Sequence, residues 1–217
     1  MTAFGLYVYA DTNYQSPFML GRGDHMLMGS DWPYNRVPRC LKVYYMMNFS
    51  YHLEDLLAHL IHPAQNDFFE MLLHHYITLM LVAGSYMTNV WNSGINAMIQ
   101  MDNGDFFVGV VKTFIDVIPA VGVFCIYLCL LSSWIYFRVF IFTKEVIWEE
   151  TMAGRWRIDD SPLHQNTIQI LLFFLLVLNV YWAVLILKSG LRFLKKGDAK
   201  DMQNPVIGDS IKNKPSN

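Results

Sequence analysis

The sequence predicts an all-α membrane protein, on the basis of its composition and the distribution of its charges. Of 217 residues, 54% are hydrophobic and only 16% are charged, so the chain is more apolar than a soluble domain normally is. Two stretches, Val117–Phe137 and Ser161–Leu187, contain no Asp, Glu, Lys or Arg. Each reaches the ~20 residues that a helix needs to cross a bilayer core. Backbone groups in lipid must be hydrogen-bonded within the segment, so these spans are expected to be helices.

A third uncharged stretch, Met71–Met101, is longer than one straight span requires. Its middle part, SYMTNVWNSG, is polar enough to interrupt a helix. Gly94 is the residue in that part with the widest range of backbone conformations, and we expect it to act as the hinge. The stretch is therefore predicted to form one span followed by a second, shorter element.

The stretch Leu41–Ile61 is apolar but is interrupted by Glu54 and Asp55. It can span the membrane against other helices or lie in the interface, and we interpret it as a buried span. With the other stretches it gives about four to six membrane segments. The stretch Thr143–Pro162 mixes charges with tryptophans, which is typical of an interfacial loop.

Polar side chains recur along the uncharged stretch at helical spacing. His74, Thr78, Ser85 and Asn89 would fall within about 60° of one another on a helix, and would face protein or a cavity. Such a stripe can simply hydrogen-bond neighbouring helices, or it can line a catalytic site. His75 points about 100° away and is expected to pack elsewhere.

Asp102 and Asp105 follow three residues apart, which would place them on one helix face. Ionisable groups within a membrane segment are costly, so this pair is a candidate functional site. A proton relay to His74 would be compatible with transport, but the sequence lacks the repeated halves typical of secondary transporters.

Other classes of function find little support. The net charge of −2 argues against nucleic-acid binding. Cys40, Cys125 and Cys129 do not form a metal or disulfide pattern, so neither a metal site nor a bound cofactor is expected. Four basic residues close the last span and predict that the C-terminus lies on the cytoplasmic or matrix side: Lys188, Arg192, Lys195 and Lys196.

The strings NDFFEMLLHHYITLMLVAGSYMTN, MDNGD and NVYWAVLILKSGLRFL resemble the TLC-domain family, and within it the ceramide synthases. The resemblance implies a helical bundle around a cavity, in which an acyl group passes from acyl-CoA to the amine of a sphingoid base. By position it implies that His74 and His75 are the family's histidine pair and that Asp102 and Asp105 are its acids. A buried imidazole can act as nucleophile or general base, and a carboxylate can orient it.

The same resemblance divides the chain and exposes departures from the family. It implies an N-terminal helix end and loop over residues 1–40, the TLC-like transmembrane domain over residues 41–196 and a polar tail over residues 197–217. The chain looks N-terminally truncated relative to the family. Four positions lack a group that the family pattern has: Met101 and Asn179 stand in place of histidine, Asn92 of arginine and Gly109 of glutamate.

Two hypotheses follow. The one we favour is a catalytically degenerate, ceramide-synthase-like protein that serves as an accessory, lipid-binding subunit beside other membrane proteins. The alternative is an active sphingoid base N-acyltransferase with acyl-CoA as co-substrate. The resemblance implies the endoplasmic reticulum; a subunit of a respiratory-type assembly would instead reside in the mitochondrial inner membrane. Asn179 and the stripe residues would line the polar part of the cavity in either case.

Overall fold

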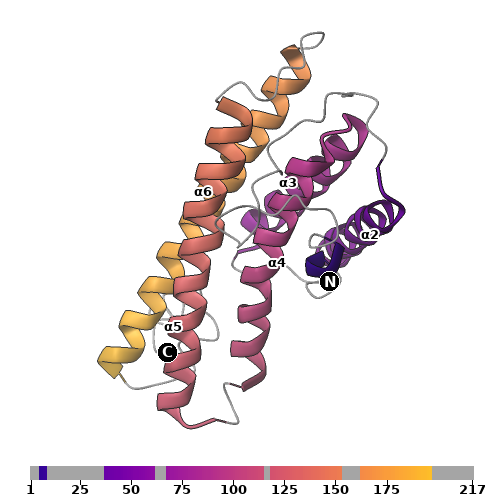
Figure 1. Ribbon diagram of the computed structural model, residues 1–217. Helices are drawn as coiled ribbons and strands as arrows, with labels where there is room; N and C mark the ends of the chain where they lie inside the picture. The colour runs from indigo at the N-terminus through magenta and orange to yellow at the C-terminus, as the bar shows by residue number, and fades with distance from the viewer. Residues whose placement is uncertain (1–4, 9–36, 62–66, 115–117, 153–161, 197–217) are drawn as a thin grey trace.

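The computed structural model describes residues 5–8, 37–61, 67–114, 118–152 and 162–196 (Figure 1). No strand occurs within these ranges, and the predicted all-α fold is confirmed. The main elements follow one another as α2 (Arg39–Ile61), α3 (Phe68–Met87), α4 (Trp91–Phe114), α5 (Ala120–Ser133), η3 (Trp134–Met152) and α6 (Pro162–Lys196).

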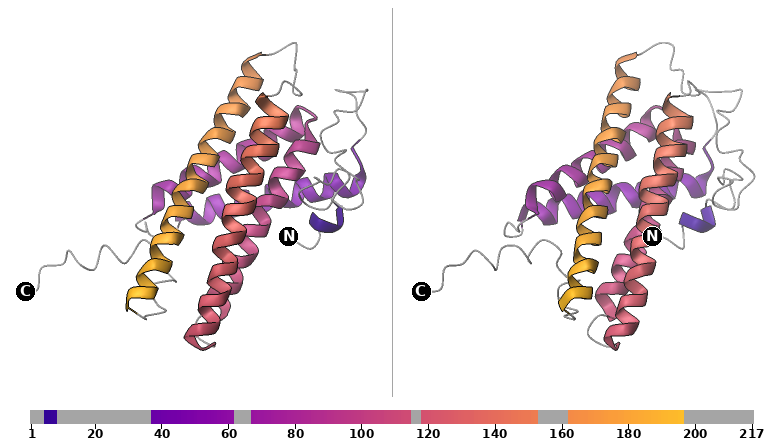
Figure 2. Two further views of the ribbon diagram at one scale, coloured as in Figure 1. Left: turned by 60° about the vertical axis from the view of Figure 1, so that its left-hand side comes forward. Right: turned by 90° about the vertical axis from the view of Figure 1, so that its left-hand side faces the viewer.

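The two longest rods form one side of the molecule. Helix α5 continues without a break into η3, whose backbone is wound as a π-helix, and α6 runs antiparallel beside this combined rod (Figures 1 and 2). Helix α4 packs against both α5 and η3, while α3 packs against α6, α4 and α2. Helix α2 lies across the bundle on the far side of α3 from α6 (Figure 2).

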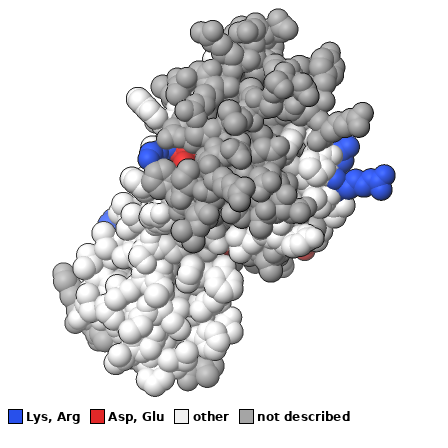
Figure 3. All heavy atoms as spheres, in the orientation of Figure 1, with Lys and Arg blue, Asp and Glu red and all other residues white. Residues whose placement is uncertain are grey.

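Three of the described helical stretches are long and apolar enough to cross a membrane: Phe68–Met87, Val121–Trp148 and Asn166–Leu194. Helices α2 and α4, of 23 and 24 residues, are as long as a span but more polar. The lower part of the face drawn in Figure 3 shows no charged side chain among its described atoms. This distribution is expected of helices whose outer surface faces lipid.

The predicted interfacial loop over Thr143–Pro162 is wrong for its first part, because η3 continues to Met152. Residues 153–161 lie outside the described ranges. The charges of this segment misled the prediction because one of them is internal. The Glu145 side chain is fully buried and accepts a hydrogen bond of 3.2 Å from the amide of Asn96 on α4. A carboxylate satisfied in this way does not require a loop.

The expected break in the long uncharged stretch occurs, but Gly94 is not its hinge. Helix α3 ends at Met87, and Asn89 takes a positive φ of 60°, which asparagine tolerates better than most residues. Gly94 lies inside α4 and serves a different purpose. A Cβ there would lie 2.6 Å from Oγ of Ser85 and would also collide with the hydroxyl of Tyr45. Glycine therefore allows α4 to approach α2 and α3 closely.

The buried side chains form three clusters. One joins α2 to α4 around Tyr44, Tyr45 and Ile95, and a second joins α3, η3 and α6 around Ile77 and Phe142. The third joins α4, α5 and α6 at the opposite end of the long rods. The first two clusters flank the polar side chains of α3 and α4 that the sequence analysis selected.

The close approach at Gly94 can be tested by substitution. Gly94→Ala should lower the free energy of unfolding of the detergent-solubilised protein by about 1–3 kcal/mol, and with it the melting temperature, because the added methyl overpacks the contact with Ser85 and Tyr45. Gly109→Ala is the matched control on the same helix, since a Cβ there meets nothing within 4 Å. The control should be neutral or stabilising by up to about 1 kcal/mol. Equal melting temperatures for the two variants would contradict this account of Gly94.

Candidate functional site

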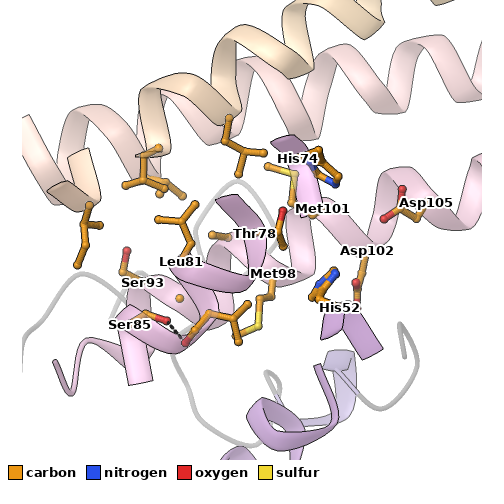
Figure 4. A pocket seen from close by; sticks show the side chains of 17 residues that line it. His52, His74, Thr78, Leu81, Ser85, Ser93, Met98, Met101, Asp102 and Asp105 are labelled. Carbon is orange, nitrogen blue, oxygen red and sulfur yellow. Dashed lines mark hydrogen bonds between the residues drawn. The ribbon is translucent and has the colours of Figure 1, made fainter. Parts of the chain in front are cut away.

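A small pocket lies where α2, α3, α4, η3 and α6 meet, and its walls are mostly apolar (Figure 4). Its volume is about 60 Å³. The apolar walls include Leu81, Val82 and Met98, with Val146 from η3 and Leu172 from α6. The polar members are His52, His74, Thr78, Ser85, Ser93, Asp102 and Asp105.

The pocket brings together most of the polar stripe that the sequence analysis described. His74, Thr78 and Ser85 project into it from α3 (Figure 4). Asn89 lies past the end of this helix, in the turn before α4, so the helical spacing that linked it to the stripe does not extend that far. Of the expected stripe, the three members within the helix share one face.

His74 is held by aromatic packing. Its ring meets the ring of Trp182 on α6 edge-on, at a centroid distance of 5.0 Å. Within the described part of the chain, Nδ1 of His74 and Oγ1 of Thr78 are buried without a hydrogen-bond partner. No carboxylate among the described residues therefore orients the imidazole through Nδ1.

The two acids of α4 both reach the pocket but are bound to other groups. Tyr44 on α2 donates its hydroxyl to Oδ2 of Asp102 at 3.2 Å. Oδ1 of Asp105 forms an ion pair with Nη2 of Arg138 at 2.6 Å. Both acids, three residues apart on α4, line the pocket, yet each contacts a partner from a different helix.

Arg138 is almost completely buried, with 2% of its side chain exposed. Besides the ion pair with Asp105, its Nη2 donates to the carbonyl oxygen of Met101 at 2.6 Å. Its guanidinium carbon stands 4.1 Å from the ring centroid of Trp134, a favourable cation–π distance. A lone arginine near a span end was visible in the sequence, but its partner was not, because Asp105 is distant along the chain and belongs to another helix. Asp116, another acid that precedes Arg138 in the sequence, lies outside the described residues.

The positions that depart from the family pattern have different surroundings. Met101 lines the pocket at the end where His74 lies (Figure 4), and the side-chain amide nitrogen of Asn179 is 3.7 Å from its sulfur. Asn179 is fully buried on α6. Gly109 is on an open side of α4. Asn92 belongs to α4, but its side chain is outside the described part.

His75 turns away from His74, as its position on the helix predicts. Its ring centroid lies 5.7 Å from that of His59 and 5.5 Å from that of His74. It packs toward α2, where His52 and Asp55 lie close to it. The two adjacent histidines thus belong to two neighbouring but different clusters.

The fold and the site define an all-α membrane protein with a polar cluster at the centre of an apolar bundle. The sequence model of the TLC domain matches residues 1–188. The chain therefore belongs to the TLC-domain family.

Several curated relatives carry names from sphingolipid synthesis. The chain is 25% identical over its whole length to the sphingosine N-acyltransferase lac1 of Schizosaccharomyces pombe, of which it covers 57%. It is 24% identical to the ceramide synthase hyl-2 of Caenorhabditis elegans, with 85% of this chain and 59% of that protein aligned. It is 28% identical to the sphingosine N-acyltransferase-like protein FUM17 of Gibberella moniliformis, with 93% and 53% aligned. The chain thus spans somewhat more than half the length of these relatives.

The buried ion pair predicts that loss of Asp105 and loss of Arg138 have unequal effects on stability. Asp105→Asn should destabilise the protein by about 1–3 kcal/mol, because it leaves a buried guanidinium without its counter-charge. We expect less than the loss typical of a fully buried pair, since 64% of the Asp105 side chain is exposed. Arg138→Met removes the buried charge itself and should be tolerated better than Asp105→Asn.

Thermal unfolding of the two single variants and the double variant in detergent measures the coupling. In the Arg138→Met background, Asp105→Asn should have almost no further effect. Glu54→Gln, at an exposed acid of α2, is the control for loss of a carboxylate. Additive effects of the two substitutions would show that the pair does not stabilise the bundle.

Proposed function

We propose that this protein is a catalytically degenerate member of the TLC-domain family that serves as an accessory, lipid-contacting subunit of a membrane assembly. The observation that carries the proposal is the state of His74. Its Nδ1 has no hydrogen-bond partner among the described residues, while Asp102 is bound by Tyr44 and Asp105 by Arg138.

Acyl transfer through an imidazole requires more than the ring itself. A nucleophile or general base is normally oriented by a third group, which also stabilises the positive charge that develops on it. At this pocket the residue before Asp102 is Met101, whose thioether has no proton to relay. Groups that act as a unit lose most of their effect when one is missing. The arrangement therefore supports loss of the transfer reaction.

The size of the pocket supports the same proposal. A volume of about 60 Å³ is roughly that of two water molecules. Sites that enclose a small organic ligand usually measure about 300–1,000 Å³. Apolar side chains of α3, η3 and α6, among them Leu81, Val146 and Leu172, line this small space.

A role beside other proteins is supported by the outer face of α2. Lys42, Val43, Met46, Met47 and Ser50 line an open depression of about 480 Å³. Methionine is adaptable and enriched at protein interfaces, and a lysine and a serine are less suited to a lipid-facing surface. This mixture favours contact with a partner chain at α2, whereas the apolar outer faces of the long rods favour contact with lipid.

The second candidate is an active sphingoid base N-acyltransferase that uses acyl-CoA. It is favoured by the convergence of His74, Asp102 and Asp105 on one pocket, and by the names of the relatives. Such an enzyme would require the pocket to open and His74 to gain an acid partner. Under this alternative we expect the endoplasmic reticulum; as an accessory subunit the protein can instead reside in the mitochondrial inner membrane.

We expect no acyl-CoA-dependent ceramide formation from the purified protein in lipid nanodiscs, with a fungal relative assayed in parallel as the positive control. Met101→His alone should not restore turnover, because Asn92, Gly109 and Asn179 still lack the groups expected at their positions. The measurement is radiolabelled acyl transfer to a sphingoid base. Turnover that is lost in His74→Ala would overturn the degenerate interpretation and establish the alternative.

The accessory role predicts the composition of the native particle. Extracted from membranes in mild detergent, the chain should migrate in a large particle with stoichiometric unrelated subunits, as measured by native gel and mass spectrometry. Met46→Glu and Met47→Glu on α2 should release it from that particle. The control is Phe173→Leu, at an exposed apolar position of α6, which should leave the particle intact. A chain that is extracted alone or as a small homo-oligomer would contradict the subunit role.

A further inference from the structure

We propose that His52, Asp55 and His75 form a binding site for a divalent transition-metal ion, and that Zn²⁺ is the ion which their chemistry suits best. The two imidazoles and the carboxylate each offer one ligand atom, and these atoms all lie within 4.8 Å of one another. The site adjoins the His74 pocket through His52, and it does not depend on the proposed function.

The local structure explains how the three residues meet. His52 and Asp55 are three residues apart on α2, so they occupy one face of that helix. His75 comes from α3, which packs directly on α2, and its ring points away from the His74 pocket toward this face. All three side chains are partly buried, so their ligand atoms are shielded without being sealed off.

The hydrogen bonding of the histidines favours a ligand at this place. Within the described residues, Nδ1 of His52 and Nδ1 of His75 are both buried without a hydrogen-bond partner. A buried polar atom without a hydrogen-bond partner is destabilising. A metal ion bound by the two imidazoles would give each ring a partner for a nitrogen that now has none. Coordination would therefore offset part of the destabilisation caused by burying these nitrogens.

The set of ligands selects the class of ion. Two imidazole nitrogens and one carboxylate oxygen suit Zn²⁺, which binds such groups at about 2.0–2.2 Å in tetrahedral geometry. Ligand atoms around such an ion are about 3.3 Å apart, so the ligand atoms, now within 4.8 Å of one another, must draw closer when the ion binds. Three protein ligands leave the fourth position for water or another ligand. His52 also lines the pocket that contains His74, so the proposed site lies beside that pocket (Figure 4).

Occupation of the site would join α2 to α3. The expectation from the sequence was that no metal site exists, because the cysteines show no ligand pattern. The proposed ligands instead come from a short spacing on one helix and a single histidine on the next, a combination that becomes visible only when the helices are packed.

The test uses the full chain purified in mild detergent without a polyhistidine tag, stripped with a chelator and titrated with Co²⁺ and then Zn²⁺. We expect one Co²⁺ per chain with the visible absorption of a tetrahedral ion, displacement by Zn²⁺, and a rise in melting temperature with Zn²⁺. If the stripped protein binds neither ion stoichiometrically, the proposal is wrong. This measurement requires no variant.

Variants then identify the ligands. His52→Ala, Asp55→Asn and His75→Ala should each weaken Co²⁺ binding about 100-fold or more, because loss of an outer partner of a ligand alone costs 10–100-fold. Glu54→Gln, a neighbouring exposed acid, and His74→Ala, a neighbouring histidine in the pocket, should bind as the parent does. Size-exclusion profiles and circular dichroism check that the variants are folded. If His75→Ala does not fold, His75→Gln replaces it in the binding measurement. Unchanged binding in folded ligand variants, or loss of binding in His74→Ala, would refute the assignment.

Discussion

The buried guanidinium of Arg138 is the constraint on which much of the structure depends. A charge within an apolar helical bundle must be paired and hydrogen-bonded, or its desolvation is prohibitive. Asp105, the carbonyl of Met101 and the ring of Trp134 meet most of this requirement, while Nε of Arg138 is buried without a hydrogen-bond partner among the described residues. Gly104 makes the contact possible, since a Cβ there would lie 3.0 Å from Cδ of Arg138. Helix α4 is thereby fixed against η3.

This contact has consequences for the pocket. By binding the backbone at Met101 and the side chain at Asp105, Arg138 sets the rotation of α4 about its axis, and with it the direction in which Asp102 points. The hydroxyl of Tyr44 then satisfies Asp102 from α2. The acids are therefore held by the scaffold of the bundle, and the neighbouring imidazole of His74 is oriented by Trp182 instead.

The other half of the bundle depends on the packing of α2 against α3 and α4. Tyr45 donates its hydroxyl to the carbonyl of Trp91 at 2.9 Å, and Gly94 leaves room for that hydroxyl beside Ser85. The same packing brings His75 against His52 and Asp55. One set of helix contacts thus accounts both for one wall of the pocket and for the second histidine cluster, and the two adjacent histidines of α3 have different chemical surroundings.

The sequence by itself determined the class of fold, because charge-free stretches of sufficient length can only be helices in a bilayer. It also placed His74, Thr78 and Ser85 on one face and turned His75 to another, since these relations follow from the geometry of a single helix. Only the tertiary structure decided which groups from different helices meet. The pairing of Asp105 with Arg138, the burial of Glu145 against Asn96 and the close approach at Gly94 are contacts between separate helices. Periodicity along one segment carries no information about the register of its neighbours, and that register is set by how all the side chains pack together.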